Sequence, residues 1–352
     1  MKAHFKKYTL NFKQASGTSR GILTTKDTYF LIIEDSGKLG IGECGVFKGL
    51  SHDDRLDYSD MLTWVCENIH LGAEVLWNEL RDWPSIQFGI EQAFLSLASD
   101  HPLVLFPSKF VQGLDAIPIN GLVWMGSSEF MKKQIDEKIF AGFTCVKIKI
   151  GAIDFDEELR LISSIREQFS SKMIEIRVDA NGGFDSINAL DKINELSEYE
   201  LHSIEQPIMK NQHDKMAQLC SNTVLPIALD EELIGVVKLI DKENLLRKLM
   251  PQYIILKPSL VGGFKGSKEW INIAEKLGIG WWVTSALESN IGLNAIAQWT
   301  YTLQNDMPQG LGTGGLFTNN FEVGLFVKNG HLHCDLNIIS VENLLSDFVS
   351  KN

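Results

Sequence analysis

Acidic side chains follow short apolar runs at regular intervals through the middle of the chain. Asp179, Glu205 and Asp230 each end such a run, at spacings of 26 and 25 residues. Carboxylate oxygens without histidine or cysteine partners favour Mg²⁺, which keeps positions open for water and substrate. Three anions brought together without a cation would repel one another. The trio therefore predicts a magnesium site, whereas each carboxylate alone could equally cap a helix or pair with a lysine.

Lysines lie in the same region. Lys147 and Lys149 are two residues apart, so on a strand they share one face. Two adjacent ammonium groups and desolvation both lower a lysine pKa, and a lysine with a pKa of about 7–8 is a useful general base. A later lysine, Lys257, also follows an apolar run. These residues predict a proton-transfer site; the alternative is a pair of surface lysines on an edge strand.

A cation beside basic lysines favours one class of chemistry. A divalent cation can bind a substrate carboxylate and stabilise the ene-diolate that forms when a lysine removes the α-proton. A Schiff-base aldolase would use Lys149 or Lys257 without a metal, and the carboxylate trio would then lack a purpose. A non-catalytic barrel would have lost some of these residues, and none is missing. We therefore expect an enzyme that acts on a small carboxylate.

The elements that must position these side chains are strands in a repeating pattern. Short β-rich runs alternate with helical patterns from about residue 117 onward, as right-handed βαβ units do. The eight runs are Ile117–Trp124, Thr144–Ile150, Ile174–Asp179, Ser203–Gln206, Ile227–Leu229, Tyr253–Lys257, Gly280–Thr284 and Gln309–Gly312. Eight units close a barrel whose active site lies at the carboxyl ends of the strands. We predict an α/β fold, a TIM-like (β/α) barrel over residues 116–321, with Lys257 well round the ring from Lys149.

The first 115 residues read as a separate α+β domain. A hairpin is predicted around Asp35–Lys38, and small or exposed segments at Ser16–Gly21 and Phe47–His52 are predicted loops. Helical spacing of apolar residues covers Asp54–Ile69 and Ile86–Ala98.

The last segment of the chain carries a second hairpin signal. Leu325–Lys328 and His331–Asp335 flank Asn329 and Gly330. We expect residues 322–352 to pack back on the N-terminal domain.

Composition excludes several classes of partner. The formal charge of −12 argues against nucleic acid, which needs a basic face. No stretch approaches the roughly 20 apolar residues that span a bilayer. The five cysteines are widely spaced without a Cys-x-x-Cys pair, which fits reduced thiols in a cytoplasmic protein. A small-molecule carboxylate remains the expected partner, and the oligomeric state is open.

The same residues resemble the enolase superfamily, and within it the muconate-lactonising subgroup. Val146–Lys149 resembles the Lys-x-Lys element of that subgroup, and Leu256–Pro258 resembles the strand that bears the opposing lysine. Three segments resemble the metal-ligand strands: Arg177–Asn181, Ile204–Pro207 and Leu229–Glu231. The likeness covers nearly the whole chain. It implies the modified barrel of enolase type with an N-terminal α+β capping domain.

The resemblance also implies a role for each residue. Lys149 would remove the α-proton and return it to a leaving group, Lys257 would stay opposite as a cation, and Lys147 would hold a carboxylate oxygen. Mg²⁺, for which Mn²⁺ can substitute, would be held by Asp179, Glu205 and Asp230. Behind these ligands, Asn181 and Glu231 would orient them.

Within the subgroup, Thr284–Ser289 and Gly310–Phe317 are most similar to the corresponding segments of its dehydratases, which are hydro-lyases. The implied substrate contacts are Ser285, Glu288, Gly312, Thr313 and Gly314. A racemase of N-succinyl amino acids would use the same metal and lysines and stays open, as does a cycloisomerase. Dipeptide epimerases usually carry Asp-x-Asp where this chain has Gly312–Gly314, which counts against them.

Overall fold

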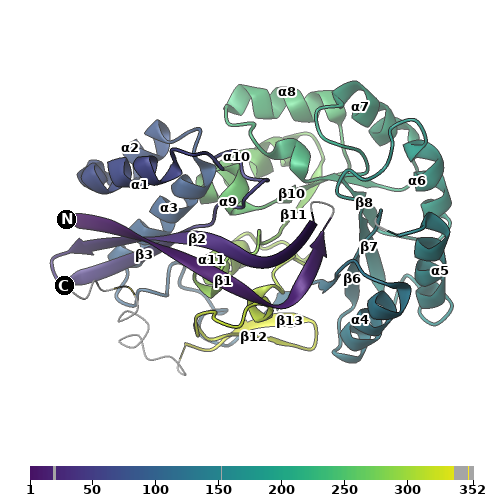
Figure 1. Cartoon of the computed structure of the whole chain (residues 1–352), viewed down its shortest axis with the longest axis horizontal. Helices are drawn as coiled ribbons and strands as arrows, with labels where there is room; N and C mark the ends of the chain where they lie inside the picture. The colour runs from purple at the N-terminus through teal and green to yellow at the C-terminus, as the bar shows by residue number, and fades with distance from the viewer. Residues whose placement is uncertain (19–20, 152, 337–347, 349–352) are drawn as a thin grey trace.

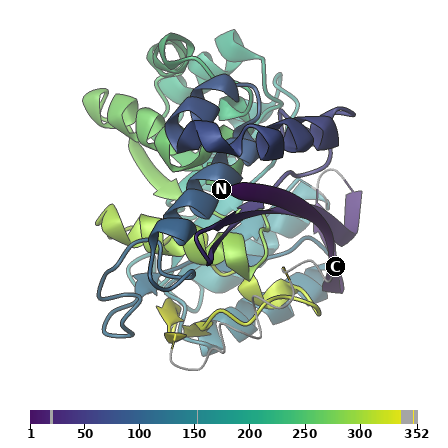
Figure 2. The same ribbon diagram turned by 90° about the vertical axis from the view of Figure 1, so that its left-hand side faces the viewer.

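The N-terminal part of the chain is a three-stranded antiparallel sheet with three helices packed against it (Figures 1 and 2). The computed structural model describes residues 1–18, 21–151, 153–336 and 348. The elements here are β1 (Lys2–Thr18), β2 (Gly21–Asp35), β3 (Lys38–Cys44), α1 (Tyr58–Glu67), η1 (Ile69–Leu71), α2 (Gly72–Glu79) and α3 (Pro84–Ala98). Both predicted helices are confirmed, although the first starts four residues later than expected.

The predicted hairpin between β2 and β3 is confirmed. Its two turn residues, Ser36 and Gly37, both have positive φ (50° and 82°), as a type I′ turn requires. The loop predicted at Ser16–Gly21 is wrong for most of its length. Residues 16–18 pair with residues 23–21 inside the β1–β2 ladder, because cross-strand pairing overrides the small, polar composition. Residues 19 and 20 lie outside the described residues.

Close approach of helix α3 to strand β3 depends on glycine. A Cβ atom at Gly42 would lie 1.9 Å from the backbone oxygen of Gly89, so only glycine permits this contact. The helix then buries Ile86, Ile90 and Ala93 against the sheet. This packing fixes the position of the strand end and loop that follow β3.

The second part is a curved, parallel, seven-stranded sheet in the order β11-β10-β9-β8-β7-β6-β5. Its strands are β5 (Gly121–Val123), β6 (Cys145–Lys149), β7 (Glu175–Asp179), β8 (Ser203–Glu205), β9 (Ile227–Leu229), β10 (Tyr253–Leu256) and β11 (Gly280–Val283). The predicted eighth strand is reduced to two bridges that join the sheet edges, Ile119–Gln309 and Thr284–Gly310. The predicted first strand divides into β4 (Ile117–Pro118) and β5.

Helices cover the outside of this sheet, and Figure 1 shows α4 to α8 following one another around its rim. The helices are α4 (Ser128–Phe140), α5 (Phe155–Arg166), α6 (Ala189–Ser197), α7 (His213–Asn222), η2 (Glu231–Leu233), α8 (Leu239–Leu249), α9 (Pro258–Val261), α10 (Gly263–Lys276), α11 (Asn290–Thr302) and η3 (Gly314–Leu316). The strand–helix alternation predicted from apolar spacing is thus confirmed. No helix in the described ranges is long and apolar enough to cross a membrane.

A layer of large side chains fills the barrel interior one step before the strand ends. The Arg177 guanidinium lies 4.3 Å from the ring centroid of Trp282 and donates to Glu175 at 2.7 Å. Because alternate strand residues share a face, Arg177 lies directly beneath Asp179. Trp282 therefore belongs to the floor of the site, and it does not line the cavity above.

The C-terminal hairpin is confirmed as β12 (Leu325–Lys328) and β13 (His331–Cys334), with β13 paired to β4. Further along, the Phe348 ring lies 5.0 Å from that of Phe30 in β2 and 5.3 Å from that of Phe321. These contacts support packing of the tail on the N-terminal domain. The domain boundaries themselves stay a prediction.

Candidate active site

Four successive strands, β6 to β9, bring the predicted residues to one end of the barrel. Lys149 pairs in register with Asp179, and Asp179 pairs with Glu205. Adjacent strands are about 4.8 Å apart, so these side chains lie side by side. Asp230 directly follows β9, the next strand. The carboxyl ends of successive strands therefore assemble the group, as the sequence predicts.

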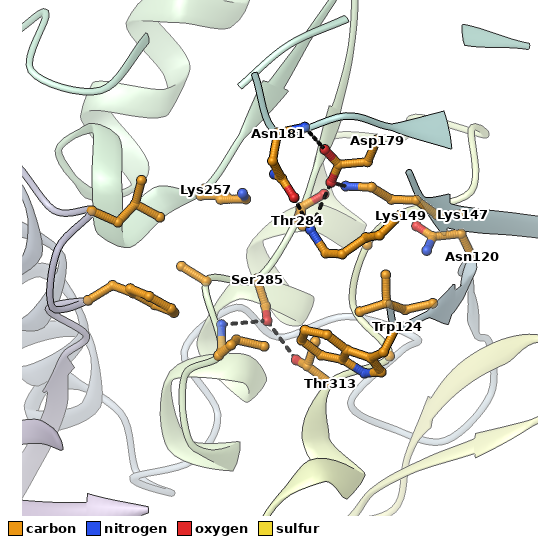
Figure 3. A pocket seen from close by; sticks show the side chains of 17 residues that line it. Asn120, Trp124, Lys147, Lys149, Asp179, Asn181, Lys257, Thr284, Ser285 and Thr313 are labelled. Carbon is orange, nitrogen blue, oxygen red and sulfur yellow. Dashed lines mark hydrogen bonds and ion pairs between the residues drawn. The ribbon is translucent and has the colours of Figure 1, made fainter. Parts of the chain in front are cut away.

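Lys147 and Lys149 both point into the barrel, as Figure 3 shows. The Lys147 ammonium lies 2.8 Å from Asp179 Oδ2 and is also paired with Glu205. Lys149 Nζ lies 3.0 Å from the same Asp179 oxygen and donates to Asn181 Oδ1 at 2.6 Å. Asp179 thus accepts from two ammonium groups.

The expected lowering of the lysine pKa values is wrong for Lys147. Burial would lower the pKa of Lys147, but the carboxylates of Asp179 and Glu205 outweigh it and raise the pKa. Burial would likewise lower the pKa of Lys257, but the Asp230 carboxylate outweighs burial, so the pKa of Lys257 is also raised. Direct pairing with buried carboxylates is the physical reason, because it stabilises the charged form of each lysine.

Two of the three carboxylates have pKa values shifted in opposite directions. Burial and the adjacent Asp179 carboxylate raise the pKa of Glu205. Burial would also raise the pKa of Asp179, but Lys147 and Lys149 hold it low. Glu205 Oε1 is buried without a hydrogen-bond partner among the described residues. An unsatisfied buried carboxylate oxygen is costly, and an oxygen-seeking cation would satisfy it. The donor chemistry of this site therefore fits Mg²⁺.

The carboxylates are held by lysines rather than assembled around a common point. Within the part of the chain that the structure describes, no three acidic, histidine or cysteine side chains already form a metal-binding group. Asp230 is paired with Lys257, and Lys147 lies between Asp179 and Glu205. The assignment of these three carboxylates as metal ligands stays a prediction, and a divalent cation would compete with the lysines for them.

The two residues predicted to orient the ligands are connected to each other. Asn181 donates its side-chain N–H to Glu231 Oε1 at 3.1 Å, and its backbone N–H to Asp179 Oδ1 at 3.0 Å. Asn181 has a φ of 44°. Such a conformation is tolerated by asparagine and turns the chain sharply after the strand. It places the amide oxygen of Asn181 on Lys149.

A cavity of about 730 Å³, including its open mouth, lies above these charges. Its polar side carries both strand β6 lysines, and Lys257 enters from the opposite side (Figure 3). The apolar side chains that line the rest are Phe47, Leu50, Leu122, Trp124 and Leu287. The cavity is thus lined by both charged and apolar side chains.

Three of the five predicted substrate contacts line this cavity: Ser285, Gly312 and Thr313. The Ser285 and Thr313 hydroxyls are 2.6 Å apart and hydrogen-bonded, as Figure 3 shows. They join the loop after β11 to the glycine-rich segment on the cavity wall.

Glu288 and Gly314 do not line the cavity, so their predicted substrate contact is corrected. Glu288 is fully buried and accepts from Ser259 Oγ (2.5 Å) and from Ala286 N (2.7 Å). Leu287 has a φ of 62°, which turns the chain so that Leu287, rather than Glu288, reaches the cavity. Gly314, the first residue of η3, lies against Asn290 at the start of α11. Both residues contact the segments behind the cavity wall.

Sequence reasoning missed the side chains that the first barrel strand contributes. Asn120, Leu122 and Trp124 all line the cavity. Their spacing of two residues was a usable signal, since alternate strand residues share a face. Gln134 of α4 accepts from the backbone N–H of Trp124 (2.9 Å) and donates to its carbonyl (3.0 Å). This double contact fixes the strand end that carries Trp124.

The loop after β3 brings the N-terminal domain to the cavity. Phe47 and Leu50 line it, whereas His52 does not and lies 3.8 Å from Asp82. Further along the same loop, Asp53 is fully buried and accepts from the backbone and hydroxyl of Ser85 at 2.8 and 2.6 Å. Asp53 therefore anchors the loop to the start of α3.

Fold and site together define a class. A capping domain with a modified barrel, and lysines facing carboxylates at the strand ends, mark the chain as a member of the enolase superfamily. Residues 130–336 match the family described as Enolase C-terminal domain-like, so the chain belongs to it.

More particular similarity covers nearly the full length. The chain is 44% identical to the o-succinylbenzoate synthase of Desulfotalea psychrophila, over 94% of this chain and 98% of that protein. The crystal structure of MenC from that organism superposes with a TM-score of 0.84 at 41% identity, covering 95% and 99% of the two chains. A muconate lactonizing enzyme from Pseudomonas fluorescens matches at a TM-score of 0.80 and 21% identity over 98% of each chain, and this shows the fold alone.

Proposed function

We propose that this chain catalyses the reaction of an o-succinylbenzoate synthase. The reaction is the syn dehydration of 2-succinyl-6-hydroxy-2,4-cyclohexadiene-1-carboxylate to 2-succinylbenzoate. The observation that carries the proposal is the placement of Lys149 and Lys257 on opposite sides of one cavity, beside three strand-end carboxylates. The near full-length identity of 44% to a protein of that name supports it.

Lys149 is the proposed base. Its Nζ projects into the cavity beside Asp179, where it can take the proton next to the ring carboxylate. The electrons of that C–H bond pass to the carboxylate as an ene-diolate. The Lys149 ammonium then returns the proton to the departing hydroxyl on the same face, water leaves, and the ring becomes aromatic. A single lysine on one face explains why the two groups would leave from the same side.

Lys257 and Lys147 are proposed to act as fixed cations. Lys257 faces the other side of the ring, where a positive charge stabilises the ene-diolate and the ring face. Lys147 lies deepest, beside Asp179 and Glu205, and is placed to hold a carboxylate oxygen of the substrate. Pairing with the neighbouring carboxylates raises the pKa of both lysines, which favours their charged form.

Asp179, Glu205 and Asp230 are the proposed ligands of Mg²⁺. When bound, the ion supplies positive charge where the ene-diolate develops negative charge. The chain's own apolar side chains receive the rest of the substrate, and Trp124 and Leu287 are among those that line the cavity. A place in menaquinone biosynthesis and a cytoplasmic location follow from this activity as further predictions.

The test measures two activities of the same preparation in the presence of Mg²⁺. Formation of 2-succinylbenzoate from the cyclohexadiene substrate is followed by ultraviolet absorbance, and racemisation of N-succinyl amino acids is followed by polarimetry. The proposal predicts that kcat/KM for dehydration exceeds that for racemisation. Racemisation without dehydration by a folded protein would reject the synthase assignment and leave the barrel and lysines as those of a racemase.

A further inference from the structure

A carboxylate of the N-terminal domain reaches across to a barrel helix. Glu43 of β3 is fully buried and accepts hydrogen bonds from the backbone N–H groups of Ser289 and Gly292, both at 2.9 Å. It also accepts from the Ser289 hydroxyl at 2.5 Å and, within its own domain, from Thr28 at 2.8 Å. The barrel donors lie at the first turn of α11, where free N–H groups and the helix dipole favour an anion.

That helix begins directly after the cavity wall. Ser285, Ala286 and Leu287 line the cavity, and Ser289 follows two residues later. Leu287 is held at a φ of 62°, a conformation that persists only where the surroundings fix it. Local hydrogen bonds contribute, since Leu287 N–H donates to Ser285 Oγ at 3.2 Å. The Glu43 contacts fix the far end of the same loop.

The same loop is connected to the strand that bears Lys257. Glu288 accepts from Ala286 N–H and from the hydroxyl of Ser259, two residues after Lys257. The Lys26 ammonium is buried near the carboxylates of Glu288 and Glu43, and it has no hydrogen-bond partner among the described residues. It offsets part of their negative charge. One buried network thus joins the N-terminal sheet, the cavity wall and the end of β10.

A second carboxylate of the N-terminal domain also accepts hydrogen bonds at the start of a barrel helix, and it provides a comparison for Glu43. Glu91 of α3 accepts from the backbone N–H groups of Phe264 (2.5 Å) and Lys265 (3.0 Å) at the start of α10. It is the same kind of contact, a carboxylate of the N-terminal domain on a barrel helix. None of these three residues lines the catalytic cavity.

We propose that Glu43 is a positioning residue for the reaction. By holding Ser289, Glu43 fixes the position of Ser285–Leu287, the part of the cavity wall that would contact the substrate. The packing of the N-terminal domain on the barrel therefore determines the shape of this barrel loop. This inference rests on the proposed function for its kinetic part and on the geometry alone for its structural part.

The test compares Glu43→Ala and Glu43→Gln with the matched control Glu91→Ala in the full chain. Backbone hydrogen exchange of the peptide covering residues 284–292 is measured by mass spectrometry. For Glu43→Ala we expect exchange about tenfold faster and a KM for the cyclohexadiene substrate about tenfold higher. We expect kcat within about threefold of wild type and unchanged Mg²⁺ affinity, because the lysines and carboxylates are untouched. For Glu43→Gln, the exchange rate and the KM should lie between those of wild type and Glu43→Ala, since the amide oxygen still accepts from Ser289.

Glu91→Ala should lower Tm but leave the exchange of residues 284–292 and the KM at wild-type values. A lowered Tm in Glu43→Ala with unchanged exchange and KM would overturn the proposal and leave Glu43 a purely structural residue. If wild type lacks synthase activity, the proposed function fails, and the exchange comparison still decides whether Glu43 orders the wall. If Glu43→Ala does not fold, the same readouts on Glu43→Gln decide.

Discussion

Asp53 should make the stability of the N-terminal domain depend on pH. Its carboxylate anchors the loop that delivers Phe47 and Leu50 to the cavity, and burial raises its pKa from 3.8 to about 6 despite two hydrogen bonds from Ser85. The folded state therefore holds the proton more tightly than the unfolded state. This stabilisation is complete below pH 3.8 and is lost as the pH rises through 6.

The size of the effect follows from the two pKa values. Their difference corresponds to about 3 kcal/mol in total, since each tenfold change is worth about 1.4 kcal/mol. About 2 kcal/mol of this falls between pH 4.5 and pH 7.5. Asp53→Asn does not titrate and can still accept from Ser85. Relative to wild type, the variant should gain about 2 kcal/mol in free energy of unfolding over that pH interval.

Urea unfolding of both proteins at the two pH values measures this difference, and other titrating groups cancel in the comparison. Asp54→Asn is the control, because Asp54 is the exposed neighbour in the same loop and its carboxylate accepts an exposed hydrogen bond from Gly49 N–H at 2.7 Å. Its difference from wild type should be nearly the same at both pH values. If the difference in unfolding free energy between Asp53→Asn and wild type is also the same at both pH values, burial does not raise the pKa of Asp53, which refutes the prediction.

Three further substitutions test other parts of the account. Lys149→Ala should lower kcat for dehydration by about 10³-fold while Mg²⁺ still binds, and substantial residual turnover would reject Lys149 as the base. Asp230→Asn should weaken Mg²⁺ binding by at least about 100-fold in a calorimetric titration, and an unchanged affinity would remove Asp230 from the ligand set. Phe348→Ala should cost about 3 kcal/mol of unfolding free energy, because the ring is buried against Phe30 and Phe321, with no change in KM.

The strand-end residues could be predicted because their signal is local. Each lies at the end of a short apolar run, and parallel strands bring such ends together without further information. The rule that alternate strand residues share a face places Lys147 and Lys149 together, and it applies equally to Asn120 and Trp124. These two were missed because neither is charged, and the prediction followed charged residues. Much of the barrel and its lysine–carboxylate group was therefore accessible from sequence.

What could not be predicted depends on contacts between distant segments. Glu288 follows a strand end much as Lys149 and Asp179 end theirs, yet the positive φ of Leu287 turns it away from the cavity that those two residues line. The direction of the Lys147 pKa shift depends on which carboxylates lie within contact distance, and spacing alone does not give that. The hairpin tip near residues 16–18 is a strand because its partner strand continues opposite it.

The central claim is that strand-end carboxylates hold a divalent ion beside a lysine base that dehydrates the cyclohexadiene carboxylate. Its most direct test follows formation of the aromatic product with Mg²⁺, after removal of the metal with excess chelator, and after Mg²⁺ is added back. The account predicts turnover, loss of turnover, and recovery. Turnover that persists unchanged in the chelated, metal-free protein would contradict it.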